Sequence, residues 1–259
     1  NEKEQTWPYY SFYLYEDPSI NFSKRPQVQS YTQNSKSALF NGMINPIIPY
    51  NIKGSIWYQG ENNVSRFKEY ETLFPAMIKD WRKKWNSDFP FYFVQIAPFE
   101  NYNGLSSSLR NVQRKTLKVE KTGMVVTLDI GEIDDIHPSN KHDVGYRLAG
   151  LALSNDYGKP MVASGPLYKN FEVSGNTLNV TFDFIGSGLT SYDKELSAFE
   201  IAGADKKYVA AEASIENNKV YIYSSKIQNP KYARYAWKDT SVASLFNREG
   251  LPASTFTTE

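Results

Sequence analysis

The sequence contains no cysteine, and this absence excludes disulfide bonds and thiolate metal sites. It also lacks any run rich in lysine or arginine, and its 29 basic side chains are nearly balanced by 28 acidic ones. Because nucleic-acid binding relies on clustered basic side chains, this balance argues against a nucleic-acid partner. No apolar stretch approaches the roughly 20 residues that span a bilayer, so we expect no membrane partner.

Histidine is scarce, with two residues in the chain, so few side chains are available for acid–base chemistry near neutral pH. The first residues, NEKEQTWPYY, lack the basic and apolar regions of a signal peptide. Aromatic residues are frequent, with 19 Tyr, 15 Phe and 5 Trp. Core packing is the ordinary reason for such a content, although flat rings also suit the faces of sugars.

Residues 38–158 alternate between short apolar runs and amphipathic stretches. The apolar runs predict buried strands and the amphipathic stretches predict helices. The expected strands are 52–58, 91–96 and 124–130, and the expected helices are 67–85, 107–119 and 140–157, the last capped by Asn140. Since strands that alternate with helices form a parallel sheet covered on both faces, we expect an α/β layer.

The other two regions of the chain have different sequence patterns. After residue 159, short alternating segments are separated by Gly, Asn and Pro turns, which predicts a small antiparallel β region. Residues 1–37 show no clear periodicity apart from one strand candidate at 9–15. The expected organisation is therefore an irregular lead-in over 1–37, an α/β domain over 38–158 and a β region over 159–259.

One segment whose side chains could take part in catalysis follows the third predicted strand. It is Asp134-Asp135-Ile136-His137-Pro138. An aspartate near a histidine in a constrained loop can hold the Nδ1–H of the imidazole while Nε2 accepts a proton. A surface loop whose two aspartates merely precede a helix is the alternative. His142 lies in the first turn of the next helix, where a solvated histidine is ordinary. Ser139 adjoins the helix cap, and we expect its hydroxyl to hydrogen-bond at the helix terminus.

The second such segment, Gln59-Gly60-Glu61-Asn62-Asn63, follows the first predicted strand. Glycine lets the backbone approach a reacting group, its N–H can donate to an oxyanion, and an amide side chain can add another donor. Glu61 could orient a histidine or bind substrate. A turn composed of loop-favouring residues is the alternative. Because both segments end neighbouring parallel strands, we expect the His137 ring to lie within a few ångströms of this loop.

Several segments together, in order along the chain, resemble motifs of the sialate O-acetylesterase family of SGNH hydrolases. They are Asn-Gly-Met-Ile at 41–44, Trp-Tyr-Gln-Gly-Glu-Asn-Asn at 57–63, Asp-Trp-Arg at 80–82, Phe-Pro-Phe-Tyr at 89–92, Asp-Ile-His-Pro at 135–138, and the tail segments at 201–205, 234–237 and 249–253. The resemblance covers roughly residues 37 to 257. It implies a flavodoxin-like parallel sheet, of which this chain carries a part.

The resemblance implies hydrolysis of acetyl esters on sugars by a serine nucleophile, with no metal or cofactor, in a secreted or periplasmic protein. His137 would be the catalytic base, oriented by Asp134 or Glu61. Gly60 and either Asn62 or Asn63 would lie near the oxyanion, beside Gln59. The substrate class would be O-acetylated sugars.

The chain departs from the family pattern in its serines. The family places the nucleophile in a Gly-x-Ser turn after the first strand, and nothing in residues 1–40 resembles that turn. We therefore expect the serine, and the first strands of the sheet, to lie in an N-terminal segment outside this chain, and the chain alone to be inactive.

Two other functions remain open. A non-catalytic glycan-binding module could have kept the cleft and lost the nucleophile. A glycosidase could use Glu61 and Asp134 as its pair of carboxyl groups, which would need to lie roughly 5–9 Å apart. The glycosidase leaves the ordered set of motifs unexplained.

Overall fold

The computed structural model describes Thr32 and residues 35–259, and the chain divides into two compact units, residues 1–49 and 50–259. In the first unit, a π-helical turn η2 (Phe40–Ile44) is followed by a 3-10 turn η3 (Asn45–Ile47). The strand candidate at 9–15 lies outside the described residues. The domain boundaries expected from the sequence stay predictions.

The second unit begins with a three-stranded parallel sheet. Its strands β1 (Ser55–Trp57), β2 (Phe91–Val94) and β3 (Thr122–Val125) are ordered β1-β2-β3. The predicted α/β layer is thereby confirmed. The strand expected at 124–130 is wrong in its extent, because the chain leaves the ladder after Val125 and turns into a loop.

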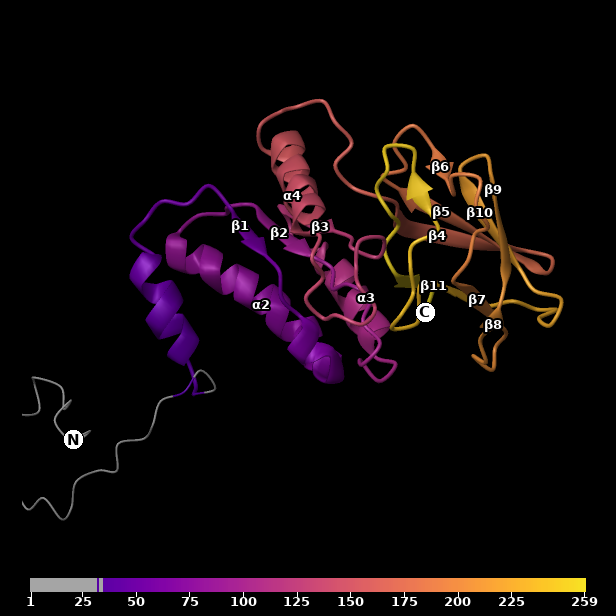
Figure 1. Ribbon diagram of the computed structural model, residues 1–259, viewed down its shortest axis with the longest axis horizontal. Coiled ribbons are helices and arrows are strands. Elements are labelled where there is room, and N and C mark those ends of the chain that lie inside the picture. The colour runs from indigo at the N-terminus through magenta and orange to yellow at the C-terminus, as the bar shows by residue number, and fades with distance from the viewer. Residues whose placement is uncertain (1–31, 33–34) are drawn as a thin grey trace, which may run out of the picture. The chain divides into compact units, whose positions relative to one another are not determined.

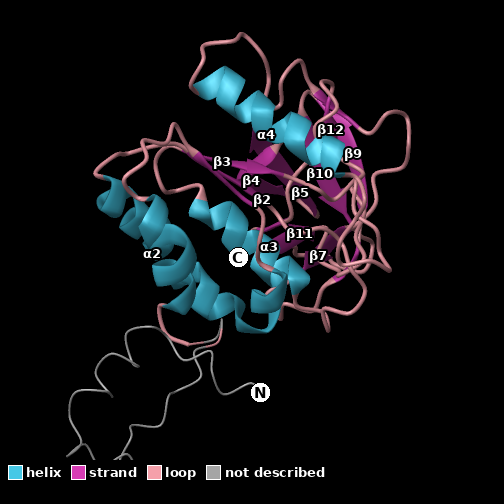
Figure 2. Cartoon of the chain, turned by 60° about the vertical axis from the view of Figure 1, so that its left-hand side comes forward, coloured by secondary structure: helices cyan, strands magenta, loops and turns pink. Residues whose placement is uncertain are grey.

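Helices cover both faces of this sheet (Figures 1 and 2). The 3-10 helix η4 (Glu61–Arg66) leads into α2 (Phe67–Trp85), which packs beside α3 (Ser106–Thr116) on one face. The opposite face of β2 and β3 contacts α4 (Lys141–Asn155). Alternation along β2 explains this arrangement, because Phe91 and Phe93 join one buried cluster while Tyr92 and Val94 join the other.

Residues 167–257 form antiparallel sheets, as the sequence predicts (Figure 1). One sheet has the order β4-β5-β10-β9, a second β13-β11-β7-β8, and a third pairs β12 with β6. The strands are β4 (Leu167–Ser174), β5 (Thr177–Asp183), β6 (Leu189–Thr190), β7 (Phe199–Ala202), β8 (Val209–Ala210), β9 (Glu212–Glu216), β10 (Lys219–Tyr223), β11 (Tyr232–Tyr235), β12 (Phe246–Asn247) and β13 (Phe256–Thr257).

Arg110 on α3 ties the helical layer to the C-terminal β region. Its fully buried guanidinium donates to Thr255 Oγ1 at 3.0 Å and to the carbonyls of Ala236 and Lys238 at 3.1 and 2.7 Å. Burial lowers the pKa of Arg110 to about 10, and the negative charge of Asp239 opposes that shift. The side chain therefore stays charged at neutral pH and fixes α3 against the chain that follows β11.

Candidate active site

The two sequence segments singled out above lie at the same edge of the parallel sheet, but the expectation that they end neighbouring strands is wrong, because β2 lies between β1 and β3. The close approach of the His137 ring to the Gln59–Asn63 loop stays a prediction. Because β1, β2 and β3 run in one direction, the residues that follow them meet at the carboxyl edge. Lys141, at the start of α4, connects the two segments. Its Nζ lies 5.4 Å from the centroid of the Tyr58 ring and donates to the carbonyl of Pro138.

The loop after β1 is held by its own amide side chains. Gln59 Nε2 donates to Asn63 Oδ1 at 2.7 Å, and the Gln59 carbonyl accepts from the Tyr70 hydroxyl at 3.2 Å and from Gln113 Nε2 at 3.4 Å. With Asn63 Oδ1 occupied by this bond, the Nδ2 group of the same amide keeps its two N–H donors for a ligand. Asn62 is exposed, and its side chain makes no hydrogen bond with the described part of the chain.

Gly60 is required by close packing behind this loop. A Cβ at this position would lie 2.9 Å from Ile96 Cγ2 and 3.2 Å from Leu109 Cδ2. The Gly60 carbonyl accepts from the Asn63 N–H at 2.8 Å, whereas its own N–H has no hydrogen-bond acceptor among residues 35–259. The residue thus combines a packing role with a free backbone donor.

The loop that carries His137 is closed by Glu132. Glu132 Oε1 accepts from the Ser139 backbone N–H at 2.7 Å and from the Ser139 hydroxyl. These two donors lower the pKa of the Glu132 carboxyl. The expectation that the Ser139 hydroxyl binds the helix terminus is therefore wrong, because Asn140 Oδ1 already accepts there from the Asp143 N–H at 3.1 Å.

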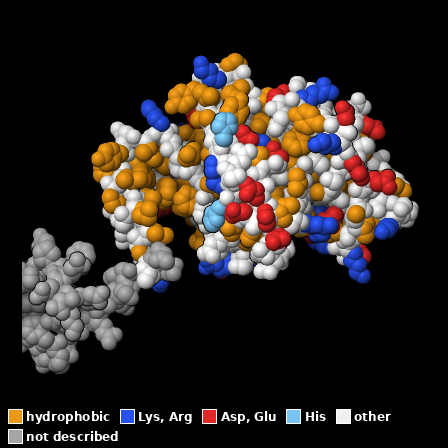
Figure 3. All heavy atoms as spheres, viewed as in Figure 1, with side chains coloured by type: hydrophobic (Ala, Val, Ile, Leu, Met, Phe, Trp, Pro, Cys, Tyr) orange, Lys and Arg blue, Asp and Glu red, His pale blue; other side chains and the backbone are white. Residues whose placement is uncertain are grey.

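The His137 side chain is exposed. Histidine side chains, pale blue in Figure 3, lie at the surface of the face shown there. Its backbone N–H donates to Asp135 Oδ1 at 2.7 Å. Within residues 35–259, the ring of His137 forms no hydrogen bond with Asp134, Glu61 or a serine hydroxyl, so the choice of orienting carboxylate stays a prediction. His142, also exposed, pairs with the neighbouring Asp143 at 3.2 Å on the first turn of α4, as expected of a solvated residue.

Asp129 and Arg147 anchor the beginning of the same loop, and both were missed from the sequence. Arg147 reaches from α4 to both carboxylate oxygens of Asp129, at 2.7 and 2.5 Å, and to the Val126 carbonyl at 2.7 Å. Both side chains are largely buried. Their separation by 18 residues gives no local pattern by which to find them.

A group of tyrosines near Glu61 was also missed. Burial, followed by the charge of Glu61, raises the pKa of Tyr58 to about 12, and the same causes raise the pKa of Tyr102. Tyr102 comes from the loop after β2, so all three loops at this edge contribute polar groups. Both phenols therefore remain protonated at neutral pH, and Tyr102 is buried whereas Tyr58 is partly exposed.

Comparison with known proteins agrees with the motifs. The family model described as "Carbohydrate esterase, sialic acid-specific acetylesterase" matches residues 25–154. The chain belongs to this family. The resemblance drawn from the ordered motifs is therefore confirmed at the level of the family.

Individual members of the family align over much of this chain. The sialate O-acetylesterase of Mus musculus is 32% identical over 65% of this chain, and that of Rattus norvegicus is 30% identical over 78%. The crystal structure of a carbohydrate acetylesterase from Xanthomonas citri superposes with a TM-score of 0.81 at 38% identity, over 85% of this chain. The chain spans only 36% and 42% of the length of the two rodent proteins and 54% of the bacterial one.

The described residues contain no group of three or more His, Asp or Glu side chains arranged to hold a metal ion. Among the helices of residues 35–259, none combines the length and apolar character needed to cross a membrane.

Proposed function

We propose that the protein of which this chain forms part is a carbohydrate O-acetylesterase that removes acetyl groups from sialic acid or related sugars. The observation that carries the proposal is the position of the Gln59–Asn63 loop and the His137 loop at one edge of the parallel sheet in a chain of this family. Family membership supports the reaction, and the edge offers a base, carboxylates and hydrogen-bond donors for it.

In the proposed reaction, a serine hydroxyl attacks the acetyl carbon while His137 takes its proton. The sugar oxygen then leaves with that proton, and water hydrolyses the acyl-enzyme with the same base. Asp134 or Glu61 orients His137. Gly60 N–H and Asn63 Nδ2 stabilise the oxyanion, a role favoured by the free donors of both groups.

We further propose that the nucleophilic serine belongs to a segment outside this sequence. In residues 35–259, no serine hydroxyl binds the His137 ring, and the serines at 11, 19, 23 and 30 lie outside the described residues. Within the described chain, β1 pairs only with β2, and Ile56 on β1 is 69% exposed. Parallel strands normally have both edges and both faces covered, so a further strand and helix would fit there.

Two parts of the proposal, the residues that contact the sugar and the location of the protein, rest on family resemblance alone. Gln59 and Asn62 would contact the sugar, and the protein would act in the periplasm or outside the cell. Cell fractionation of the producing organism tests the second of these, and recovery of the protein only from the cytoplasm would contradict it.

The decisive experiment compares this chain with the longer protein that includes its upstream residues, using a chromogenic acetyl ester and O-acetylated sialic acid. We expect background rates from the 259-residue chain and turnover from the longer protein. Serine-dependent turnover by the short chain would refute the external nucleophile. Sugar binding without turnover by the longer protein would instead identify a glycan-binding module.

A further inference from the structure

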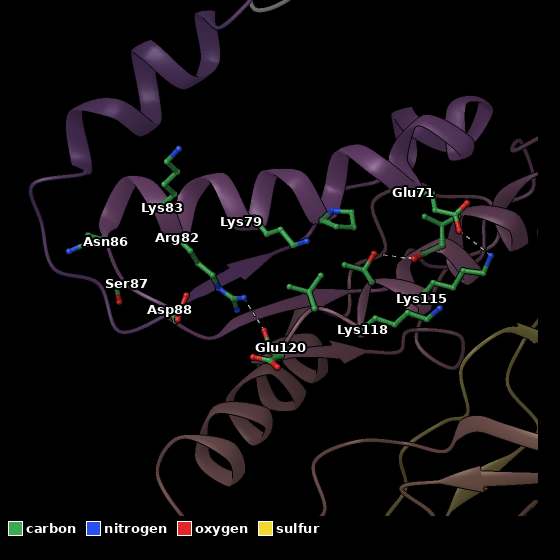
Figure 4. A pocket seen from close by; sticks show the side chains of 14 residues that line it. Glu71, Lys79, Arg82, Lys83, Asn86, Ser87, Asp88, Lys115, Lys118 and Glu120 are labelled. Atoms are coloured by element: carbon green, nitrogen blue, oxygen red, sulfur yellow. Dashed lines mark hydrogen bonds and ion pairs between the residues drawn. The ribbon is translucent and has the colours of Figure 1, made fainter.

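A groove between α2 and α3 lies apart from the candidate active site and has no role in the proposed reaction. It has a volume of about 940 Å³, within the size range of small-molecule sites. Its walls come from most of the length of α2, the C-terminal half of α3 and the segments that follow both helices and lead into β2 and β3 (Figure 4). Five basic and three acidic side chains line it: Lys79, Arg82, Lys83, Lys115, Lys118, Glu71, Asp88 and Glu120.

The acidic side chains of the groove already have basic neighbours. Glu71 pairs with Lys115 at 3.1 Å. Burial lowers the pKa of Arg82, and the negative charges of Asp88 and Glu120 partly oppose that shift. Arg82 itself donates to the carbonyls of Phe89, Glu120 and Lys121 at 2.9–3.0 Å. With five basic and three acidic side chains, the groove carries a formal excess of two positive charges.

Lys79 and Lys118 are two cations of the groove that lie outside the last turns of α2 and α3. Neither forms an ion pair within residues 35–259, and both are exposed. Figure 4 shows Lys79 extending from α2 and Lys118 following the end of α3, on the two sides of the groove. Lysines in the last turn of a helix commonly offset the helix dipole. That explanation covers Lys83 and Lys115, which lie in last turns, but not Lys79.

The groove continues toward the carboxyl edge of the sheet and ends at aromatic side chains. A second hollow of about 250 Å³ shares Glu71, Val112 and Lys115 with the first, and Phe67 and Trp237 line it. Phe67 follows directly on η4, which belongs to the candidate active-site loop. The Arg234 guanidinium lies 5.8 Å from the centroid of the Trp237 ring and helps to orient it.

We propose that this groove binds a carboxylate-bearing oligosaccharide as a second, non-catalytic site. Lys79 and Lys118 would pair with the carboxylates, and Trp237 would pack against the face of a sugar ring, since its flat amphipathic surface suits one. An elongated groove with separated cations and an aromatic end fits an acidic sugar chain better than a compact phosphate, which favours arginine forks and helix N-termini. The choice of a glycan rests on the proposed function.

The test is calorimetric titration of the full-length protein with a linear trimer of sialic acid that carries no acetyl groups. We expect the double variant Lys79→Gln/Lys118→Gln to bind at least about tenfold more weakly at low salt, since each exposed ion pair contributes modestly. Trp237→Ala should weaken binding about three- to tenfold. Lys226→Gln removes an exposed lysine of the β region outside the groove and should leave binding unchanged.

Equal binding by wild type and the double lysine variant would overturn the proposal, as would the absence of binding to wild type. If a hexaglutamate peptide bound as tightly as the sialic acid trimer, the groove would be assigned to acidic proteins, and the proposal of a glycan ligand would be wrong. His137→Ala should bind the trimer as wild type does, because it leaves the groove intact. Lysine-dependent binding without esterase activity would therefore refute only the proposed reaction, and esterase activity without lysine-dependent binding would refute only the groove.

Discussion

The side-chain amide of Gln59 donates to Asn63 Oδ1 at 2.7 Å, and this bond fixes which end of the Asn63 amide faces away from Gln59. The oxygen of Asn63 is occupied, so its nitrogen is the group left to interact with a ligand. Asn62, its neighbour in the same turn of η4, is exposed and has no such support among the described residues. A pair of asparagines that the sequence leaves equivalent is thus distinguished by one hydrogen bond.

If the proposed esterase reaction holds, Asn63→Ala should reduce kcat of the longer protein by about 10²–10³, because removing one oxyanion donor typically costs that much. Asn62→Ala is the matched control, and its effect should fall mainly on KM. Steady-state kinetics with O-acetylated sialic acid measure both. A larger loss of kcat in Asn62→Ala would reverse the assignment.

His137→Ala should lower kcat/KM by about 10²–10⁴, the usual contribution of general acid–base catalysis. His142→Ala should change it little, since this ring is exposed and pairs only with the adjacent Asp143 in the described chain. The pair compares the two histidines of this chain directly. Equal losses in the two variants would show that neither histidine is the base.

Gly60→Ala should lower the free energy of unfolding by about 1–3 kcal/mol, because the new Cβ overpacks a buried site. The methyl group would lie 2.9 Å from Ile96 Cγ2 and 3.1 Å from Gln113 Nε2. Gly145→Ala is the control: apart from its chain neighbours and the nearby backbone of α4, no atom lies within 4 Å of its Cβ position, so helix propensity should stabilise that variant by about 0.5–1 kcal/mol. Urea denaturation of this chain measures both, and an unchanged midpoint in Gly60→Ala would contradict the packing role.

The Glu132 carboxyl should make stability depend on pH. Its pKa in the folded protein is lowered from 4.5 by the two Ser139 donors, so the ionised form favours folding above that pH. The contribution is lost as the pH falls below 4.5 and through the folded-state pKa. Wild type should therefore exceed Glu132→Gln in melting temperature at pH 7, and the difference should shrink toward pH 3.

Glu172→Gln provides the control for that comparison, since Glu172 is an exposed carboxylate on β4. Its melting temperature should follow that of wild type across the same pH range. If the difference in melting temperature between wild type and Glu132→Gln grew on acidification, the ionised Glu132 carboxylate would not stabilise the loop through Ser139.

Local pattern was sufficient for most of the fold. The heptad-like recurrence of apolar side chains from Phe67 to Trp85 predicted α2 with the bounds that the structure has, and Asn140 was correctly predicted as the cap of α4. Strand lengths were less predictable. Residues 126–130 are as apolar as a strand, yet Arg147 binds the Val126 carbonyl and Asp129, and those contacts hold the segment as a loop.

The sequence by itself determined the family, the α/β layer and the two loops that carry the candidate site, because motifs, periodicity and turn residues are local in the chain. Only the tertiary structure assigned Ser139 to Glu132 and separated Asn63 from Asn62. It alone brought Lys79 and Lys118 to one groove. These hydrogen bonds and this groove depend on which side chains meet once the helices have packed on the sheet. Local sequence patterns do not specify such contacts.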